Sequence, residues 1–492
     1  MTSSSSSGQI RKTARHSAIY AIGTLISRLT ALVMLPIYTR YLTPEDYGAI
    51  ELLTMAIELT GILVGFRITQ AMFRYYIMSD SEVERRQVVS TVLLTVMAAS
   101  GLGTLVLYQG GNLFSEVIFG TTQYAEEFKL FSFTLVTNAI SACGLGFLRA
   151  RQKPRVYLIV SIVTLALQVT LNLIFVVHMN LHVTGVVYSA LASGIIMSVF
   201  FMAYILSRVG INYSKTIFVK LVNFVAPLIL ASVGAFIVAY ADKYFIRVFG
   251  VLAEVGIYSL AVRVTSVMLT AFESFNMSWS ADRYEIVKRD DARLIYGQVF
   301  KLLNLFIIIA GSGLAIFAGD FFFIMTDPSF YSASSFVPFL VLCYLLKIYS
   351  MFCNFGIMLE EQTRYMAESA WLKAVVAILG YVSLIPAMGI YGAVFSLLIS
   401  NFVEFFWVNR KSIRLYDMKL PWADVAGMIA LASVLSFVSM FFPIGDWSYF
   451  FMRVSIFIVL CLSLFMLPIW SVEEKAMLRG LLFKLPGKGL SH

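Results

Sequence analysis

Apolar residues recur along this chain in runs of about 20 residues, separated by short polar stretches. Each run is long enough to cross roughly 30 Å of hydrocarbon as a helix that rises about 1.5 Å per residue. The pattern predicts an all-α polytopic membrane protein with about 14 transmembrane helices. The predicted spans are residues 17–39, 48–73, 87–108, 128–148, 156–178, 184–207, 220–242, 254–279, 298–318, 333–358, 366–386, 390–408, 422–442 and 449–468.

The composition supports this class. Of the 492 residues, 59% are hydrophobic and only 13% are charged, a balance that a soluble protein cannot bury inside one core. The net charge of +9 does not indicate nucleic-acid binding, because the basic residues lie mainly in short loops between the apolar runs. We therefore expect no nucleic-acid partner.

The distribution of basic residues predicts the orientation of the chain. Most of the 37 lysines and arginines lie in the predicted loops and tails on the side of the two termini, whereas only Arg40, Lys243 and Arg247 lie in loops on the opposite side. The positive-inside rule then predicts that both termini are cytoplasmic. The predicted outer loops are too short for a folded catalytic domain, so we expect a protein that is not an enzyme and disfavour a membrane-embedded polymerase or ligase.

The sequence also predicts an internal repeat with an offset of about 208 residues. The segment "DYGAIEL" (Asp46 to Leu52) aligns with "EVGIYSL" (Glu254 to Leu260), and "FRYY" (Phe73 to Tyr76) aligns with "DRYE" (Asp282 to Glu285). Three later segments match in the same order, which gives five matches in all. Because the repeat unit holds six spans, both copies enter the membrane in the same direction and predict two parallel lobes. The predicted divisions are a cytoplasmic tail (1–16), an N-lobe (17–208), a C-lobe (219–408), two extra helices (422–468) and a second cytoplasmic tail (469–492).

Basic residues inside the spans are the first candidates for function. A charge at the bilayer centre costs about 2.5–3.5 kcal/mol on insertion scales, so such residues normally face a cavity or a partner. An excess of arginine and lysine favours an anion, and a guanidinium can bind phosphate oxygens in two places. A lipid-linked pyrophosphate would suit a site formed by such residues. The candidates are Arg28, Arg263, Lys347, Arg67 and Arg74.

Acidic residues inside the spans are fewer and predict a different role. Buried carboxylates in transporters often titrate or bind a coupling cation, so we expect H⁺ or Na⁺ as the coupling ion and no metal or organic cofactor. The candidates for ion coupling are Glu58, Glu273, Glu51 and Asp242.

Structural explanations stay open for several of these charges. Glu58 could neutralise Arg28 on the neighbouring span, and Arg67 and Arg74 could reach the membrane surface or bind lipid phosphate. Two further basic residues in the spans are expected to extend their charged groups to the membrane surface, namely Lys373 and Arg453.

The segment "RLTALVMLPIYTRYLTPEDYGAIEL" (Arg28 to Leu52) resembles the opening of Wzx-type polysaccharide biosynthesis proteins. These are oligosaccharide flippases of the multidrug/oligosaccharidyl-lipid/polysaccharide exporter superfamily. The shared elements are the arginine in the first span, the Leu-Pro-x-Tyr segment and the "RYLTPEDYG" turn. The predicted plan of two parallel six-helix lobes plus two helices is similar to that of this family.

The resemblance implies transport of an undecaprenyl-pyrophosphate-linked oligosaccharide from the cytoplasmic to the outer leaflet of the bacterial inner membrane. It implies alternating access driven by an ion gradient or the membrane potential, in exopolysaccharide, capsule or O-antigen assembly. It further implies contacts with membrane lipids and with polysaccharide polymerase and export machinery. The alternative is a cation-coupled multidrug and toxin extruder on the same fold, which the excess of basic residues at mid-depth disfavours.

Overall fold

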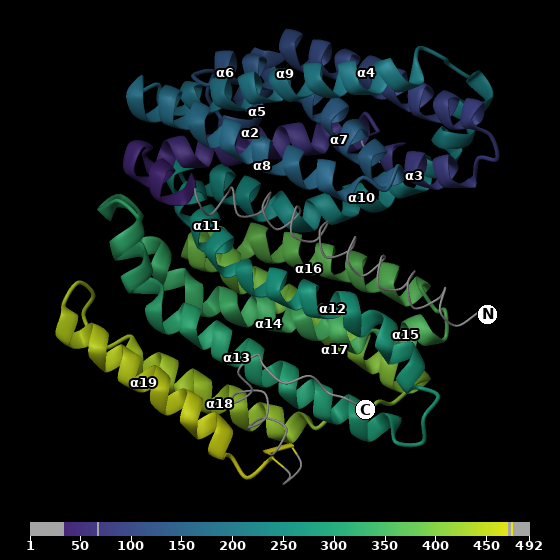
Figure 1. The fold of residues 1–492 in the computed structure, drawn as a ribbon. Helices are drawn as coiled ribbons and strands as arrows, with labels where there is room; N and C mark the ends of the chain where they lie inside the picture. Colours follow the sequence, from purple (N-terminus) through teal and green to yellow (C-terminus); the bar gives the residue numbers. More distant parts are fainter. Residues whose placement is uncertain (1–33, 66–67, 471–473, 476–492) are drawn as a thin grey trace. The chain divides into compact units, whose positions relative to one another are not determined.

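The computed structural model describes residues 34–65, 68–470 and 474–475 (Figure 1). These residues form helices and no strands, which confirms the predicted all-α class. The elements are α2 (Pro44–Leu63), α3 (Ile68–Met78), α4 (Glu82–Gln109), α5 (Gly111–Phe119), α6 (Ala125–Ser132), α7 (Thr134–Ala150), α8 (Pro154–Asn172), a π-helix (Leu173–His178), α9 (His182–Val209), α10 (Lys215–Phe249), α11 (Leu252–Thr265), α12 (Val267–Ile286), α13 (Ala292–Met325), a 3₁₀ segment (Pro328–Phe336), α14 (Val337–Cys353), α15 (Phe355–Leu359), α16 (Arg364–Met388), α17 (Ile390–Leu415), α18 (Trp422–Ser439) and α19 (Trp447–Met466).

The described helices agree closely with the predicted spans. Eleven of the helical runs in the described residues are long and apolar enough to cross a membrane, and there are twelve when the bent pair α2–α3 counts as one. The predicted span 220–242 lies within α10, and most of the predicted first span, 17–39, lies outside the described residues. The total of 14 therefore stays a prediction.

The predicted span 48–73 is interrupted between α2 and α3. Helix α2 begins with a capping box in which the Thr43 hydroxyl accepts from the Asp46 amide and the Asp46 carboxylate accepts from the Thr43 amide. It ends at Leu63, and Gly65 follows with φ = +91°, a backbone conformation that glycine adopts without a steric penalty. The interruption lies a little more than one turn after Glu58.

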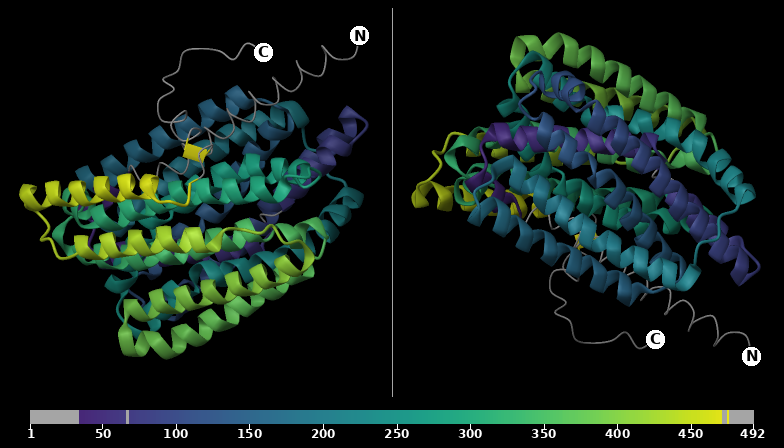
Figure 2. Two further views of the ribbon diagram at one scale, coloured as in Figure 1. Left: turned by 90° about the horizontal axis from the view of Figure 1, so that it is seen from below. Right: turned by 90° about the horizontal axis from the view of Figure 1, so that it is seen from above.

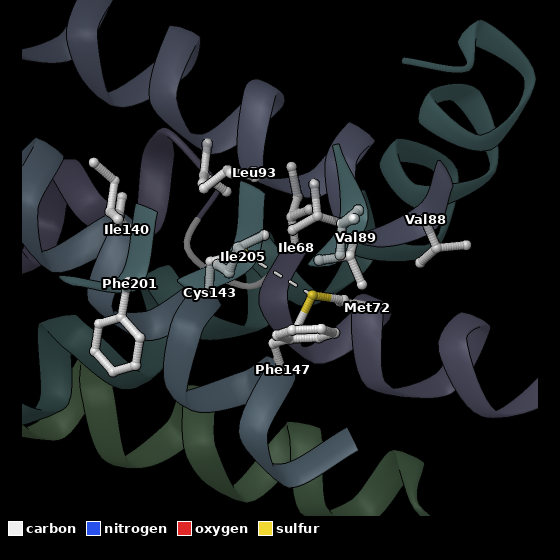
Figure 3. Close-up of a cluster of buried hydrophobic side chains, with 14 of the residues drawn as sticks. Ile68, Met72, Val88, Val89, Leu93, Ile140, Cys143, Phe147, Phe201 and Ile205 are labelled. Carbon is white, nitrogen blue, oxygen red and sulfur yellow. Dashed lines mark hydrogen bonds between the residues drawn. The ribbon is translucent and has the colours of Figure 1, made fainter. Parts of the chain in front are cut away.

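Contacts divide the chain into two compact units, of which the first holds the described residues up to Ser259 together with Met325–Phe330 and Ala377–Ala393. Its apolar core lies among α3, α4, α7 and α9 (Figure 3). The Met72 thioether lies 4.0 Å from the Cys143 sulfur, and the rings of Phe147 and Phe201 pack in the same cluster. This core fixes α7 beside α3 and α4.

The second unit holds Leu260–Ile324, Tyr331–Val376 and the described residues from Val394 onward. Its core is rich in aromatic rings, with Trp279 stacked on Phe352 at 5.7 Å between ring centroids and Phe300 against Trp422 at 4.9 Å. Edge and stacked ring pairs of this kind add to the stabilisation that burial alone gives. They connect α12, α13 and α14 with the start of α18.

The hairpin of α18 and α19 packs along α13 through a second apolar cluster (Figures 1 and 2). Ion pairs connect this C-terminal region to both halves of α13. The Arg453 guanidinium lies 2.5 Å from the Asp320 carboxylate, and the Lys301 ammonium lies 2.6 Å from the Glu474 carboxylate. The expectation that Arg453 extends to the membrane surface is wrong, because its side chain is buried and also donates to the Phe442 carbonyl.

Two repeat-matched segments pack against each other where α2 crosses α11. A Cβ atom on Gly48 would lie 2.2 Å from the Leu252 carbonyl oxygen, and one on Gly256 would lie 1.9 Å from the Pro44 carbonyl oxygen. The backbones approach so closely only because both positions are glycine. The predicted internal repeat aligns these same two glycines, in "DYGAIEL" and "EVGIYSL".

Candidate substrate and ion sites

Lys347 is a basic residue inside the second unit without a direct carboxylate partner among the described residues. It lies on α14, is half-buried, and forms no hydrogen bond or ion pair with any described residue. Lys373, Glu404 and Glu273 lie within range of its electrostatic field. The structure therefore brings two predicted site residues, Lys347 and Glu273, into one group of charges contributed by α12, α14, α16 and α17.

Lys373 belongs to this group and does not reach the membrane surface, so that expectation is wrong. Its side chain is buried, and its ammonium nitrogen lies 2.7 Å from a carboxylate oxygen of Glu404 on α17. A buried lysine needs such a partner, because an unpaired buried charge is strongly destabilising. Arg263, the other predicted mid-depth arginine of this unit, is half-buried near the end of α11.

A second group of buried charges lies in the first unit, where α2, α10 and α11 meet. The Lys243 ammonium lies 2.6 Å from the Glu51 carboxylate, and both side chains are almost entirely buried. The Tyr258 hydroxyl donates to the Asp242 carboxylate at 2.6 Å. The sequence predicted Lys243 in an outer loop, but α10 continues to Phe249 and places it inside the helix. Two predicted coupling residues, Glu51 and Asp242, therefore meet in one buried cluster.

A polar pocket of about 320 Å³ lies among α2, α3, α6 and α7 of the first unit. It adjoins the interruption between α2 and α3 and contains the predicted residue Glu58. Polar side chains supply much of its lining, together with three apolar ones. The lining residues are Thr54, Ile57, Glu58, Ile62, Thr69, Gln70, Phe131 and Asn138.

An apolar cavity of about 300 Å³ lies in the second unit, between α18 and the helices α12, α13 and α14. Gly311 and Ala315 of α13 line one side, and Phe437 of α18 with Met440, which directly follows that helix, line the other. Among the described lining residues, the polar side chains are serines. Such a cavity suits a hydrocarbon chain, because apolar cavities without convergent polar groups do not hold water well.

Of the remaining predicted basic residues, one lies on an exposed helix surface and two lie outside the described residues. Arg74 on α3 is exposed, and its guanidinium lies over the Phe224 ring at 5.0 Å, which is a cation–π contact. Arg28 and Arg67 lie outside the described residues, as does the predicted contact between Arg28 and Glu58.

Sequence reasoning missed several residues that these sites use. Glu404 is a carboxylate inside the predicted span 390–408, and its position alone could have marked it as the partner of a buried cation. Asn138 is likewise a polar residue inside the predicted span 128–148. Lys243 could have been found by extending the predicted seventh helix through the apolar residues that follow it.

The fold and these buried polar groups define a multi-pass membrane protein with an interior built to receive polar groups. The family described as polysaccharide biosynthesis protein matches residues 13–280, which is more than half of the chain. The chain therefore belongs to the polysaccharide biosynthesis protein family, as the opening segment predicted.

The chain is also similar to known proteins in sequence or in fold. An uncharacterized membrane protein of Haemophilus influenzae is 22% identical over 304 residues, covering 60% of this chain and 70% of that protein. The fold is similar to that of a lipid II flippase, MurJ, in an inward closed conformation, with a TM-score of 0.71 and 14% identity over 95% of this chain and all of that one. An inward-facing multidrug resistance transporter of the MATE family has a TM-score of 0.62 and 17% identity, over 81% of this chain and 99% of that one.

Proposed function

We propose that this protein is a flippase that moves an undecaprenyl-pyrophosphate-linked oligosaccharide across the bacterial inner membrane by alternating access. The observation that carries the proposal is Lys347, a half-buried ammonium without an ion-pair partner in the described part of an apolar bundle. Such a group needs an anion or water beside it. Membership of a polysaccharide biosynthesis family makes a lipid-linked pyrophosphate the fitting anion.

Several basic residues are proposed to contact the pyrophosphate. Lys347 and Arg263 are the described candidates in the second unit, and Arg28, Arg67 and Arg74 are further candidates from the sequence. Arginine suits the diphosphate because its planar guanidinium can bind two oxygens at once, while lysine acts as a point charge.

The apolar cavity between α18 and α13 offers a place for part of the polyprenyl chain. Its volume of about 300 Å³ holds a segment of such a chain rather than the whole of it. Burying each methylene group there stabilises the complex by about 0.8 kcal/mol. This assigns a role to α18 and α19, which lie outside the predicted internal repeat.

Ion coupling is proposed for the buried carboxylates. Glu51 and Asp242 meet beside Lys243, and Glu273 lies near Lys347, so protonation or cation binding at these groups would change the charge of the interior. We propose H⁺ or Na⁺ as the coupling ion, both termini in the cytoplasm, and outward transport toward polysaccharide polymerase and export machinery.

The test is transport by the purified full-length chain in liposomes. A fluorescent undecaprenyl-diphospho-oligosaccharide is placed in both leaflets, and the fraction accessible to an impermeant quencher is followed over time. An H⁺ or Na⁺ gradient is imposed across the vesicle membrane to supply the driving force. The proposal then expects the accessible fraction of label to rise well above one half with the protein and to remain at about one half without it. Equal curves would overturn it.

The multidrug extruder alternative makes a different prediction. It expects the same vesicles to accumulate a cationic drug in response to an ion gradient, with no movement of the labelled lipid. That result would replace the flippase proposal.

A further inference from the structure

The polar pocket beside the α2–α3 interruption contains three polar side chains without a hydrogen-bond partner in the part of the chain that the structure describes. Glu58, Gln70 and Asn138 are all exposed, and none of them makes a hydrogen bond or ion pair with a described residue. They come from three different helices, α2, α3 and α7, and all three line the same pocket. Convergence of unsatisfied groups from separate helices is the usual form of a small-molecule site.

The depth of these groups makes their exposure informative. Asn138 lies at the middle of the candidate span Ala125–Ala150, and Glu58 lies 14 residues from the start of α2, about 21 Å along the helix axis. Lipid hydrocarbon cannot hydrogen-bond a carboxylate or an amide at that depth. The pocket must therefore hold water or a polar ligand when the protein is in a membrane.

The chemistry of the lining narrows the ligand. A phosphate is disfavoured, because an ionised Glu58 offers only acceptors and carries the same charge. A bare cation fits poorly, because the pocket has a single carboxylate and a volume of about 320 Å³, roughly ten times the share of one water molecule. That volume lies at the lower end of the range for small-molecule sites, about 300–1,000 Å³.

A sugar ring matches both the polar groups of this lining and its aromatic ring. Each hydroxyl of a sugar donates to one group and accepts from another, which suits a carboxylate with two neighbouring amides. The same ring has an apolar face of C–H groups, which can pack on the ring of Phe131. The hydroxyl of Thr54 is already donated to the Ile50 carbonyl, so the unsatisfied groups are the ones expected to bind.

We propose that this pocket is a subsite for one sugar of the lipid-linked glycan, and that Glu58 makes it selective for neutral or amino sugars over acidic ones. The inference rests on the proposed flippase function, which it refines by naming the part of the substrate that the first unit holds. It also changes the role of Glu58, from a coupling group to a residue that determines specificity.

The experiment compares lipid probes with and without a sugar on the purified full-length chain in nanodiscs. The probes are undecaprenyl diphosphate and its conjugates with one glucose, N-acetylglucosamine, galactose or glucuronate residue. Each probe is titrated at two Na⁺ concentrations that differ 100-fold. For the native chain, at least one neutral conjugate is expected to bind about tenfold tighter than undecaprenyl diphosphate, and the glucuronate conjugate is not.

Substitutions locate the effect. Glu58→Gln and Asn138→Ala are each expected to reduce the preference for the neutral conjugate about fivefold, with affinity for undecaprenyl diphosphate itself unchanged. Glu58→Gln should also remove the discrimination against glucuronate. Matched controls are Glu116→Gln and Gln109→Ala, exposed residues outside the pocket, which should leave all affinities as they are.

Three outcomes overturn the assignment. Equal affinities for probes with and without a sugar, or pocket variants that weaken the binding of every probe equally, would show that the pocket does not bind the glycan. Binding by Glu58 that depends on Na⁺ and not on the sugar would make it a cation site. If undecaprenyl diphosphate and all conjugates fail to bind, the flippase proposal itself fails, and this inference fails with it.

Discussion

The polar pocket of the first unit and the apolar cavity of the second have similar volumes, about 320 and 300 Å³, but opposite linings. The polar pocket lies beside an interrupted helix, where carboxylate and amide groups have no hydrogen-bond partner among the described residues. The apolar cavity lies beside a hairpin whose arginine, Arg453, is paired with Asp320 outside the cavity lining. The described lining of the first therefore presents polar groups to the pocket and that of the second presents almost none, which favours the first as the site for a polar ligand.

The largest expected effect concerns the hairpin that covers the apolar cavity. Replacing Asp320 by alanine leaves the Arg453 guanidinium buried without its carboxylate, and breaking a buried pair in this way costs about 3–5 kcal/mol. We expect a large fall in the melting temperature of the purified protein in detergent, together with loss of binding of long polyprenyl phosphates.

The control for this substitution is Glu82→Ala, which removes an exposed pair with Arg85 and should cost less than about 1 kcal/mol. Equal losses of thermal stability in the two variants would contradict the claim that the pair of Arg453 and Asp320 holds the hairpin against α13.

Buried Lys373 and half-buried Lys347 of the second unit should separate stability from function. Lys373→Ala leaves Glu404 without its partner and is expected to destabilise the protein by about 3 kcal/mol, at the low end of the range because Glu404 keeps some exposure. Lys347→Ala removes no ion pair, so its melting temperature should stay within a few degrees of the native value. Its rate of lipid transport in liposomes should nevertheless fall at least tenfold.

One result of the lysine comparison would contradict the proposed role of Lys347. If Lys347→Ala transports at the native rate, the proposal that this ammonium holds the pyrophosphate is wrong. Lys347→Arg serves as the conservative control, because it keeps the charge at the same position and should retain part of the activity.

Filling the apolar cavity should change the preference for lipid length. Ala315→Phe places a ring in the space between α13 and α18, and displacing about two methylene groups of the lipid should lower the affinity for undecaprenyl phosphate about tenfold. A farnesyl phosphate that does not reach the cavity should bind as before. Equal weakening of both lipids would show that the cavity does not hold the chain.

The smallest expected effect is that of Glu58→Gln on stability. Because Glu58 is exposed and has no partner in the described part of the chain, its replacement should change the free energy of unfolding by no more than about 0.5 kcal/mol. Thermal unfolding of the purified variant measures this. A large loss would mean that Glu58 supports the fold and would weaken its comparison with the satisfied charges of the second unit.

Hydropathy predicted the helices well, because a long apolar run has few alternatives to crossing a membrane. It could not predict which buried charges are paired. Lys373 and Glu404 lie 31 positions apart, and Arg453 and Asp320 lie 133 apart, so only the packing of their helices shows that they meet. For the same reason, Lys373 and Arg453 were predicted to reach the surface when both are buried.

The candidate site was predicted in part. Lys347, Glu273, Glu51 and Asp242 were identified because charged residues inside apolar spans are conspicuous, and the structure gathers them into two clusters. The polar pocket was missed as a unit, because Asn138 on α7 is far in sequence from Glu58 and Gln70, and only the packing of α7 against α2 and α3 brings the three together. The interruption at Gly65 was also missed, because the apolar pattern continues across it.

The crossing of α2 and α11 at Gly48 and Gly256 has a consequence for the history of the chain. If the predicted internal repeat arose by duplication of a half-length gene, the unduplicated protein could close this contact only by meeting a second copy of itself, with one glycine facing its own image across a twofold axis. In such a protein a single mutation would place a side chain on both sides of the contact at once. In the present chain the two positions can mutate separately, and both are glycine.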